Sequence, residues 1–130
     1  MKAYWDSSAL IKALHDPKLR TSLKPGKDGT RPHSLAELFS TLTKGVNFHY
    51  SPNDAAAMLE SLSQSLDFVE LSADEAVSAI KSASSQGVRG ARIHDLMHSA
   101  AATKYQATVL FTLDEAGFST LKTSVPARVP

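Results

Sequence analysis

Cysteine is absent from this chain of 130 residues. Its absence excludes disulfides, zinc ribbons, iron–sulfur ligation and thiol nucleophiles, and it is compatible with a reducing cytosol. Long apolar runs are lacking as well, because no stretch approaches the roughly 20 residues that a membrane helix needs. The first apolar run is interrupted by Asp6, so we expect no secretory signal peptide. These absences favour a cytoplasmic protein without a membrane segment.

A strong charge of either sign is also missing, since the formal net charge is +1. The overall electrostatic field is therefore too weak to attract nucleic acid, and any RNA contact needs a local basic patch. The hydrophobic fraction of 42% is that of an ordinary globular protein, and the length suffices for one buried core. We expect a single domain over residues 1–130.

Apolar and polar residues alternate in a way that predicts both strands and helices. Strands are expected at residues 1–5, 66–71 and 108–112, with an edge strand near Val125. Helices are expected at residues 7–14, 34–44, from 52, from 72 to about 87, 94–105 and 115–121. Residues 15–31, rich in proline, glycine and lysine, are interpreted as a long loop. The alternation predicts a three-layer α/β/α sandwich with a central parallel sheet.

Four acidic residues each lie where an apolar run meets the start of an expected helix: Asp6, Glu37, Asp95 and Asp114. In a parallel sheet, strand ends and helix starts gather at the carboxyl edge, where such folds bind ligands. Carboxylates brought together there repel one another unless a divalent cation lies between them. The pattern therefore predicts a magnesium or manganese site.

Helix capping is the alternative interpretation for each of these acids. For Glu37 the partner would be Ser34, three residues earlier, in a capping box at the start of the helix. Asp54 and Glu75 lie in similar helix-start contexts and match no motif, so we assign them a capping role only. The metal-site hypothesis depends on the four acids being taken together.

Four segments carry a resemblance to a known family: DSSALI at residues 6–11, SLAEL at 34–38, DLMHSAAA at 95–102 and LFTLD at 110–114. In this order and spacing they resemble the PIN-domain ribonucleases, and among them the VapC-type toxins of toxin–antitoxin pairs, over essentially the whole chain. The resemblance implies a parallel sheet flanked by helices and endonucleolytic cleavage of RNA supported by Mg²⁺ or Mn²⁺. It further implies a homodimer that a small cognate antitoxin neutralises.

The resemblance also implies roles for individual residues. Glu37 would orient or deprotonate the attacking water, and the hydroxyls of Ser7 and Thr112 would hold the carboxylates in place. The metal ligands would be Asp6, Asp95 and Asp114.

Basic residues near the acids are candidates for binding RNA, namely Lys12, Arg89 and Arg92. Gly87 and Gly90 place the two arginines in a flexible approach to the third motif. The alternative is that these side chains are ordinary solvated surface.

One departure from the family pattern lies in the last motif. The family often has a further acid just before the phenylalanine, but here Ala116 and Gly117 precede Phe118. Glu115 is the nearest acid that could compensate. This departure leaves open whether a second metal ion is held.

Other functions remain as alternatives. His94 and His98 with Asp95 between them resemble a zinc-protease helix, but no third ligand motif is evident and the acid is aspartate. A haloacid-dehalogenase-type phosphatase would need an aspartate where Ser8 stands. A PIN-like binding module without activity and a different metal-dependent phosphohydrolase also remain open.

Overall fold

The structure, a computed structural model, describes residues 1–130. Its strands are β1 (Ala3–Trp5), β2 (Asp28–Thr30), β3 (Asp67–Phe68), β4 (Val109–Phe111) and β5 (Ala127–Arg128). Its α-helices are α1 (Ser7–Leu14), α2 (Pro17–Ser22), α3 (Pro32–Thr43), α4 (Pro52–Ser63), α5 (Ala73–Lys81), α6 (Ile93–Lys104) and α7 (Glu115–Ser119). Two 3₁₀ turns, η1 (Ser84–Gln86) and η2 (Gly90–Arg92), lie between α5 and α6.

The five strands form one sheet in the order β3-β2-β1-β4-β5, and every pairing is parallel. The chain builds outward from β1 to β2 and β3, then crosses to the other side of β1 to form β4 and β5. The topological switch point therefore lies between β1 and β4, where Trp5 is in register with Phe111. Folds of this kind bind ligands outside the carboxyl ends of the strands at that point.

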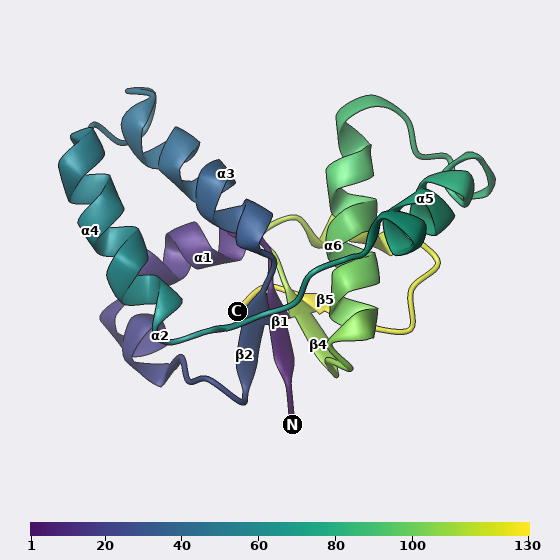
Figure 1. The fold of residues 1–130 in the computed structure, drawn as a ribbon, viewed down its shortest axis with the longest axis horizontal. Coiled ribbons are helices and arrows are strands. Elements are labelled where there is room, and N and C mark those ends of the chain that lie inside the picture. The colour runs from purple at the N-terminus through teal and green to yellow at the C-terminus, as the bar shows by residue number, and fades with distance from the viewer.

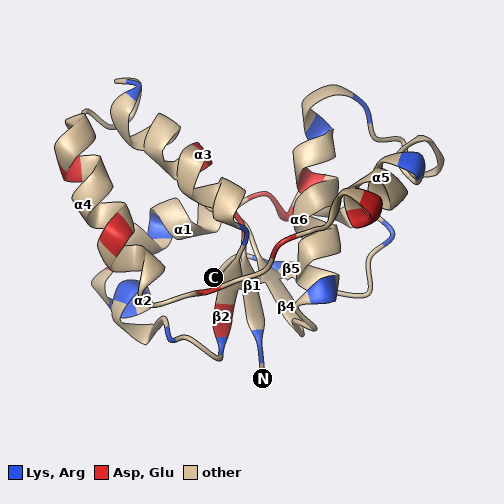
Figure 2. Cartoon of the chain, viewed as in Figure 1, with Lys and Arg blue, Asp and Glu red and all other residues tan.

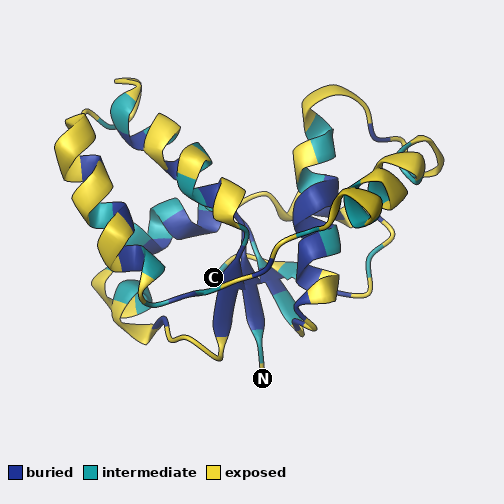
Figure 3. Cartoon of the chain, in the orientation of Figure 1, coloured by how far each residue is buried: buried dark blue, intermediate teal, exposed yellow.

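Helices cover both faces of the sheet, as the sequence predicts. Helices α1–α4 lie on one face, and α5 and α6 lie on the other (Figure 1). Side chains alternate between the two faces: Trp5 and Phe111 join the core beneath α1–α4, whereas Tyr4 and Leu110 join the core beneath α6. The two inner strands β1 and β2 are buried along their whole length (Figure 3). The prediction of a three-layer α/β/α sandwich with a parallel sheet is confirmed.

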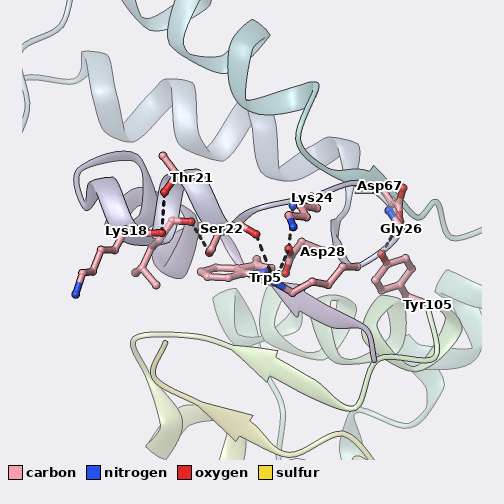
Figure 4. Close-up of polar contacts among 11 residues, drawn as sticks. Trp5, Lys18, Thr21, Ser22, Lys24, Gly26, Asp28, Asp67 and Tyr105 are labelled. Atoms are coloured by element: carbon pink, nitrogen blue, oxygen red, sulfur yellow. Dashed lines mark hydrogen bonds and ion pairs between the residues drawn. The ribbon is translucent and has the colours of Figure 1, made fainter.

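The interpretation of residues 15–31 as a loop is wrong, because this segment contains α2 and the inner strand β2. The strand reads Asp28-Gly29-Thr30, which has little intrinsic strand preference. Its burial depends on tertiary contacts (Figure 4). The Trp5 indole N–H donates to Asp28 Oδ1 at 2.8 Å, and the Lys24 backbone N–H donates to Oδ2 at 3.0 Å.

Close packing explains the glycine at the centre of β2. The Tyr105 ring, from the end of α6, lies directly over Gly29, and a Cβ at this position would lie 2.7 Å from Tyr105 Cζ. The Tyr105 hydroxyl donates to Asp67 Oδ2 at 2.6 Å, which ties the same ring to β3 (Figure 4). A side chain on the middle residue of β2 would therefore displace a tyrosine that connects α6 to the sheet.

Helix α3 begins at Pro32, two residues before the expected start, and Arg31 occupies its N-cap position without a side-chain cap. Ser34 is fully buried, 2.8 Å from Thr30 Oγ1, and makes no capping box with Glu37. The expected capping box is therefore wrong. Proline at the first helical position, a strong start signal, explains the earlier start.

Other boundaries differ by a few residues. The expected strand at 66–71 forms sheet pairs only at Asp67–Phe68, and the helix after Ser72 ends at Lys81 before the turn η1. The capping box of Ser72 and Glu75 is present as expected. The last edge strand near Val125 is β5. No helix is both long and apolar enough to cross a membrane.

Substitution of Gly29 by alanine tests the close packing of β2. We expect Gly29→Ala to lower the free energy of unfolding by about 1–3 kcal/mol, because the added methyl overlaps the Tyr105 ring. Urea denaturation measures the change. The double variant Gly29→Ala/Tyr105→Leu should cost less than the sum of the two single changes, since removal of the ring relieves the overlap. Strictly additive costs would contradict the proposed contact.

Candidate active site at the carboxyl edge of the sheet

Asp6 follows β1 directly at the switch point and forms the N-cap of α1. Its Oδ1 accepts the Ala9 backbone N–H at 2.9 Å and the Ser8 hydroxyl at 2.7 Å. No side-chain hydrogen bond uses Oδ2, although the residue is only 6% exposed. Capping and ligand binding are thus compatible at Asp6, because each role needs a different oxygen.

Asp114 has the same arrangement at the end of the neighbouring strand. It forms the N-cap of α7, and its Oδ1 accepts the Gly117 backbone N–H at 3.0 Å. A Cβ at Gly117 would overlap Oδ2 of Asp114, so the carboxylate lies against the glycine itself. Thr112, which is fully buried, accepts the Asp114 backbone N–H at 3.0 Å. The threonine therefore positions the backbone of Asp114, whereas its expected role in holding a carboxylate stays a prediction.

Glu37 and Asp95, in contrast, do not cap a helix. Glu37 lies within α3, and Asp95 is the third residue of α6, where no side-chain cap is present. Figure 2 shows acidic positions on α3 and α6, on the two sides of the sheet edge. The capping interpretation thus applies to the two aspartates that follow strands and fails for Glu37, whereas Asp95 lies in the first turn of α6 without capping it.

The pKa of Asp95 indicates that three aspartates influence one another. Burial is the largest cause of a raised pKa at Asp95, and the negative charges of Asp6 and Asp114 raise it further. The charges of His98 and Arg92 act in the opposite direction. Such interactions fall off with distance. Asp6 therefore lies in the same electrostatic environment as Asp95 and Asp114, although most of the chain separates it from them in sequence.

Glu37 has the opposite shift. The contact with His98, whose Nε2 lies 3.3 Å from Glu37 Oε1, lowers the pKa of Glu37, and partial burial opposes this effect. The N–H direction is not aligned well enough for a hydrogen bond, so the buried Oε1 has no hydrogen-bond donor within the protein. From the sequence alone, His98 is considered as part of a zinc-protease-like helix. A polar residue among the apolar residues of α6 is the one sequence signal for its place near the site.

Ser8, rather than Ser7, is the hydroxyl that holds Asp6. The Ser8 Oγ also accepts the Leu113 backbone N–H at 3.0 Å and lies 3.5 Å from Thr112 Oγ1. It therefore connects the loops that follow β1 and β4. Ser7 makes no side-chain hydrogen bond, because it is the first residue of α1 and lies outside this connection. The DSSALI motif contains both serines, and only the fold distinguishes them.

The basic residues differ in what they contact. Arg92 Nη2 donates to the Gly117 carbonyl at 2.7 Å and to Thr120 Oγ1 at 2.6 Å, which fastens α7 to the start of α6. Lys12 Nζ donates to the Pro130 carbonyl at 3.1 Å. Arg89 is exposed and makes no side-chain hydrogen bond. Binding of RNA by these three residues stays a prediction.

Glu115 has a structural contact of its own, and compensation by its other oxygen for the acid that the last motif lacks stays a prediction. Its Oε1 accepts the Val129 backbone N–H at 2.9 Å, so this carboxylate fastens the segment after β5.

The donor atoms fit a hard divalent cation that keeps part of its water. No three histidine, aspartate or glutamate side chains lie close enough together to hold a metal ion by themselves. Each of the three aspartates nevertheless keeps at least one oxygen that no protein group uses, and Glu37 Oε1 is buried without a donor. Mg²⁺ keeps several waters and needs only one or two direct carboxylates, so the residues fit such an ion.

Comparisons with solved structures support the α/β/α sandwich. PAE2754 from Pyrobaculum aerophilum is 19% identical, with a TM-score of 0.71 over 97% of this chain and 89% of that chain. VapBC2 from Rickettsia felis, bound to a DNA fragment from its promoter, is 15% identical, with a TM-score of 0.72 over 100% of this chain and 99% of that chain. VapBC-1 from nontypeable Haemophilus influenzae is 17% identical, with a TM-score of 0.68 over 99% of this chain and 98% of that chain.

At this identity the structural likeness shows the fold. The family follows from the sequence, since the PIN domain model matches residues 3–122. The chain therefore belongs to the PIN domain family. No curated protein sequence matches it significantly.

Neutralisation of Asp95 tests the crowding of the carboxylates. Because its pKa is raised in the folded protein, the cost of ionising Asp95 is absent at low pH and appears as the pH rises through that pKa. We expect Asp95→Asn to raise the free energy of unfolding of the metal-free protein at pH 7. The gain should vanish below about pH 4, where an ordinary carboxyl is protonated as well. Urea denaturation at both pH values measures it.

Asp54→Asn is the matched control, because Asp54 is the third residue of α4 as Asp95 is of α6. A carboxylate at this position favours the helix dipole, so neutralising Asp54 should leave stability unchanged or slightly lower. An equal loss in both variants would contradict the crowding of Asp95.

Proposed function

We propose that this PIN domain is a metal-dependent endoribonuclease and the toxin of a toxin–antitoxin pair. The observation that carries the proposal is that Asp6 after β1, Asp95 on α6 and Asp114 after β4 act on one another electrostatically, while Glu37 on α3 contacts His98 of α6. PIN domains are typically nucleases, and metal ions are typical of the family. We propose further that the substrate is RNA, that the reaction depends on Mg²⁺ or Mn²⁺, and that individual residues have the roles described below.

Asp6, Asp95 and Asp114 are the residues that would hold the ion. A bound divalent ion would lower the pKa of a water molecule and offset negative charge on the phosphate. The raised pKa of Asp95 supports this assignment. Burial makes the ionised carboxylate costly and Asp6 repels it, and a cation between the carboxylates would offset both effects.

Glu37 would orient the water that attacks the phosphate. Its lowered pKa keeps the carboxylate ionised at neutral pH, so Oε2 can accept a hydrogen bond from water. The same shift makes Glu37 a weak base, which favours orientation over full removal of the proton. Oε1 is buried against His98, which leaves Oε2 as the oxygen available for this role.

RNA would reach the site along the segment before α6. Arg89 is the best candidate for a phosphate contact there, since its side chain is exposed and free of internal hydrogen bonds. Arg92 would act mainly by holding α7, although its charge lies close enough to Asp95 to lower that residue's pKa. Lys12 remains a further candidate.

An antitoxin partner is proposed from the likeness to the VapBC complexes. A homodimer is supported by exposed apolar side chains on α5, a helix with no buried residue. Val77 and Ile80 are 49% and 51% exposed there. Such residues on one helix face are typical of an interface between copies.

A PIN-like binding module without activity is the second candidate. Two observations favour the inactive module. The acid that the family often has before Phe118 is absent, and the nearest acid, Glu115, accepts the Val129 backbone N–H. Titration calorimetry with Mn²⁺ separates the two candidates. Saturable binding that Asp6→Asn abolishes supports the nuclease, and no binding supports the inactive module.

Cleavage of a structured RNA tests the proposed function. We expect the protein to cut the RNA with Mg²⁺ or Mn²⁺ but not with EDTA. Asp6→Asn and Asp95→Asn should lower the rate by about a hundredfold or more, because loss of a ligand removes several kcal/mol of transition-state stabilisation. Gel analysis of the fragments measures the rate.

Asp16→Asn is the control for Asp6, because Asp16 caps α2 by accepting the Lys18 and Leu19 backbone N–H groups. Loss of a cap alone should leave cleavage intact. Equal cleavage by the wild type and the Asp6 and Asp95 variants would mean that a contaminant cuts the RNA and would refute the proposal.

The oligomeric state can be tested on α5. We expect a dimer in light scattering coupled to size exclusion, and Ile80→Lys should convert it to a monomer by burying a charge in the interface. Val129→Lys, at a residue of similar exposure (48%) beyond β5, should leave the dimer intact. A monomeric wild type would contradict the dimer.

A further inference from the structure

A tyrosine and a histidine form a buried polar pair where β1 meets α6. The Tyr4 hydroxyl lies 2.7 Å from His98 Nδ1, with Tyr4 fully buried and His98 3% exposed. Their ring centroids are 5.7 Å apart and the planes are inclined at 60°, so the polar atoms rather than the ring faces make the contact. Buried polar groups are costly unless they are paired, and an apolar pair would pack here without that cost.

The second ring nitrogen of His98 faces out of this core toward α3. Its Nε2 lies 3.3 Å from Glu37 Oε1. The histidine therefore extends from the layer of α6 to the layer of α3 and connects a buried tyrosine to an acid of the candidate active site. His33 and His94 are also near Glu37 but are exposed, so solvent screens their charges more strongly.

With His98 in its neutral form, the three groups are satisfied by one arrangement of protons. An ionised carboxylate offers only acceptors, so the Nε2 that faces Glu37 must carry a proton. A neutral imidazole then has a lone pair on Nδ1, which requires a donor. Burial raises the pKa of Tyr4, so its hydroxyl keeps its proton and can donate. The order is Tyr4 O–H to His98 Nδ1, and His98 Nε2–H toward Glu37.

We propose that Tyr4 and His98 are positioning residues: the tyrosine anchors the imidazole, and the imidazole N–H directs the Glu37 carboxylate toward the attacking water. This inference rests on the proposed nuclease function for its effect on rate. The 3.3 Å contact suits the role, because the N–H faces the buried Oε1 and leaves Oε2, the oxygen on the exposed side of the carboxylate, to meet the water. The pair touches Glu37 and none of the three proposed metal ligands through a hydrogen bond.

Nitrogen-15 NMR of the metal-free protein tests the pattern without any activity. We expect His98 at neutral pH to show a protonated Nε2 and an unprotonated Nδ1, with the signals assigned by their loss in His98→Gln. Glu37→Gln should shift the Nε2 proton of His98, whereas Asp16→Asn should not. An unprotonated Nε2, a protonated Nδ1 or no response to Glu37→Gln would overturn the inference.

Two substitutions of His98 separate positioning from packing. Glutamine places an amide N–H near the position of Nε2, whereas asparagine is too short to reach Glu37. We expect His98→Gln to retain RNA cleavage within a few-fold and His98→Asn to lose about tenfold or more in kcat with KM unchanged. Tyr4→Phe should also lower kcat rather than raise KM. Equal activity of the two His98 variants, or a wild-type kcat in Tyr4→Phe, would overturn the inference.

Tyr105→Phe is the matched control, because it removes a similarly buried tyrosine hydroxyl bond, to Asp67, at the opposite end of α6. It should lower thermal stability and leave kcat unchanged, and all variants are compared below their melting temperatures. If the wild type cuts no RNA but the NMR pattern is present, the proposed function fails and the positioning of Glu37 stands. If RNA is cut and the NMR pattern is absent, the inference alone fails.

Discussion

The pairing of β1 with β4 is the interaction on which the candidate site depends. Trp5 is aligned with Phe111, and the Asp6 backbone N–H donates to the Phe111 carbonyl at 3.0 Å. Because Tyr4 and Trp5 enter different cores, a slip of one residue would exchange their faces and disrupt both cores. The different side chains that these two apolar three-residue strands place in the two cores thus fix the register, and the register places Asp6 beside the loop that carries Asp114.

The four acids are stabilised in two different ways. Asp6 and Asp114 each use one oxygen to accept a helix N–H, so the start of a helix offsets part of their charge. Glu37 and Asp95 have no such partner. His98 compensates Glu37 and lowers its pKa, whereas Asp95 remains partly buried among like charges with a raised pKa. The site therefore has uneven electrostatics: one carboxylate is kept ionised by the protein, and another is ionised at a cost that a cation would remove.

The sequence predicted the elements whose residues carry a local signal, namely the apolar strands β1 and β4 and the helices with an amphipathic face. It did not predict β2, because the reasons for that strand are tertiary: the Trp5 indole that pairs with Asp28 and the Tyr105 ring that lies over Gly29. The acids could be named from motif order and spacing. The supporting contacts could not, since a choice between adjacent serines, or a role for a histidine on a helix, depends on which neighbours the fold brings within about 3 Å.

The departure in the last motif has a physical counterpart that bears on the chemistry. Gly117 has no Cβ, so the Asp114 carboxylate can lie against it, and Glu115 is committed to the Val129 backbone. The acid next to Asp114 is Glu115, and one of its oxygens is used by the Val129 backbone. In the proposed nuclease, a site without the further acid would rely more on the orientation of the attacking water than on a second ion. The orientation of Glu37 would then control the rate, which would be a reason for a core to accept the cost of a buried tyrosine–histidine pair.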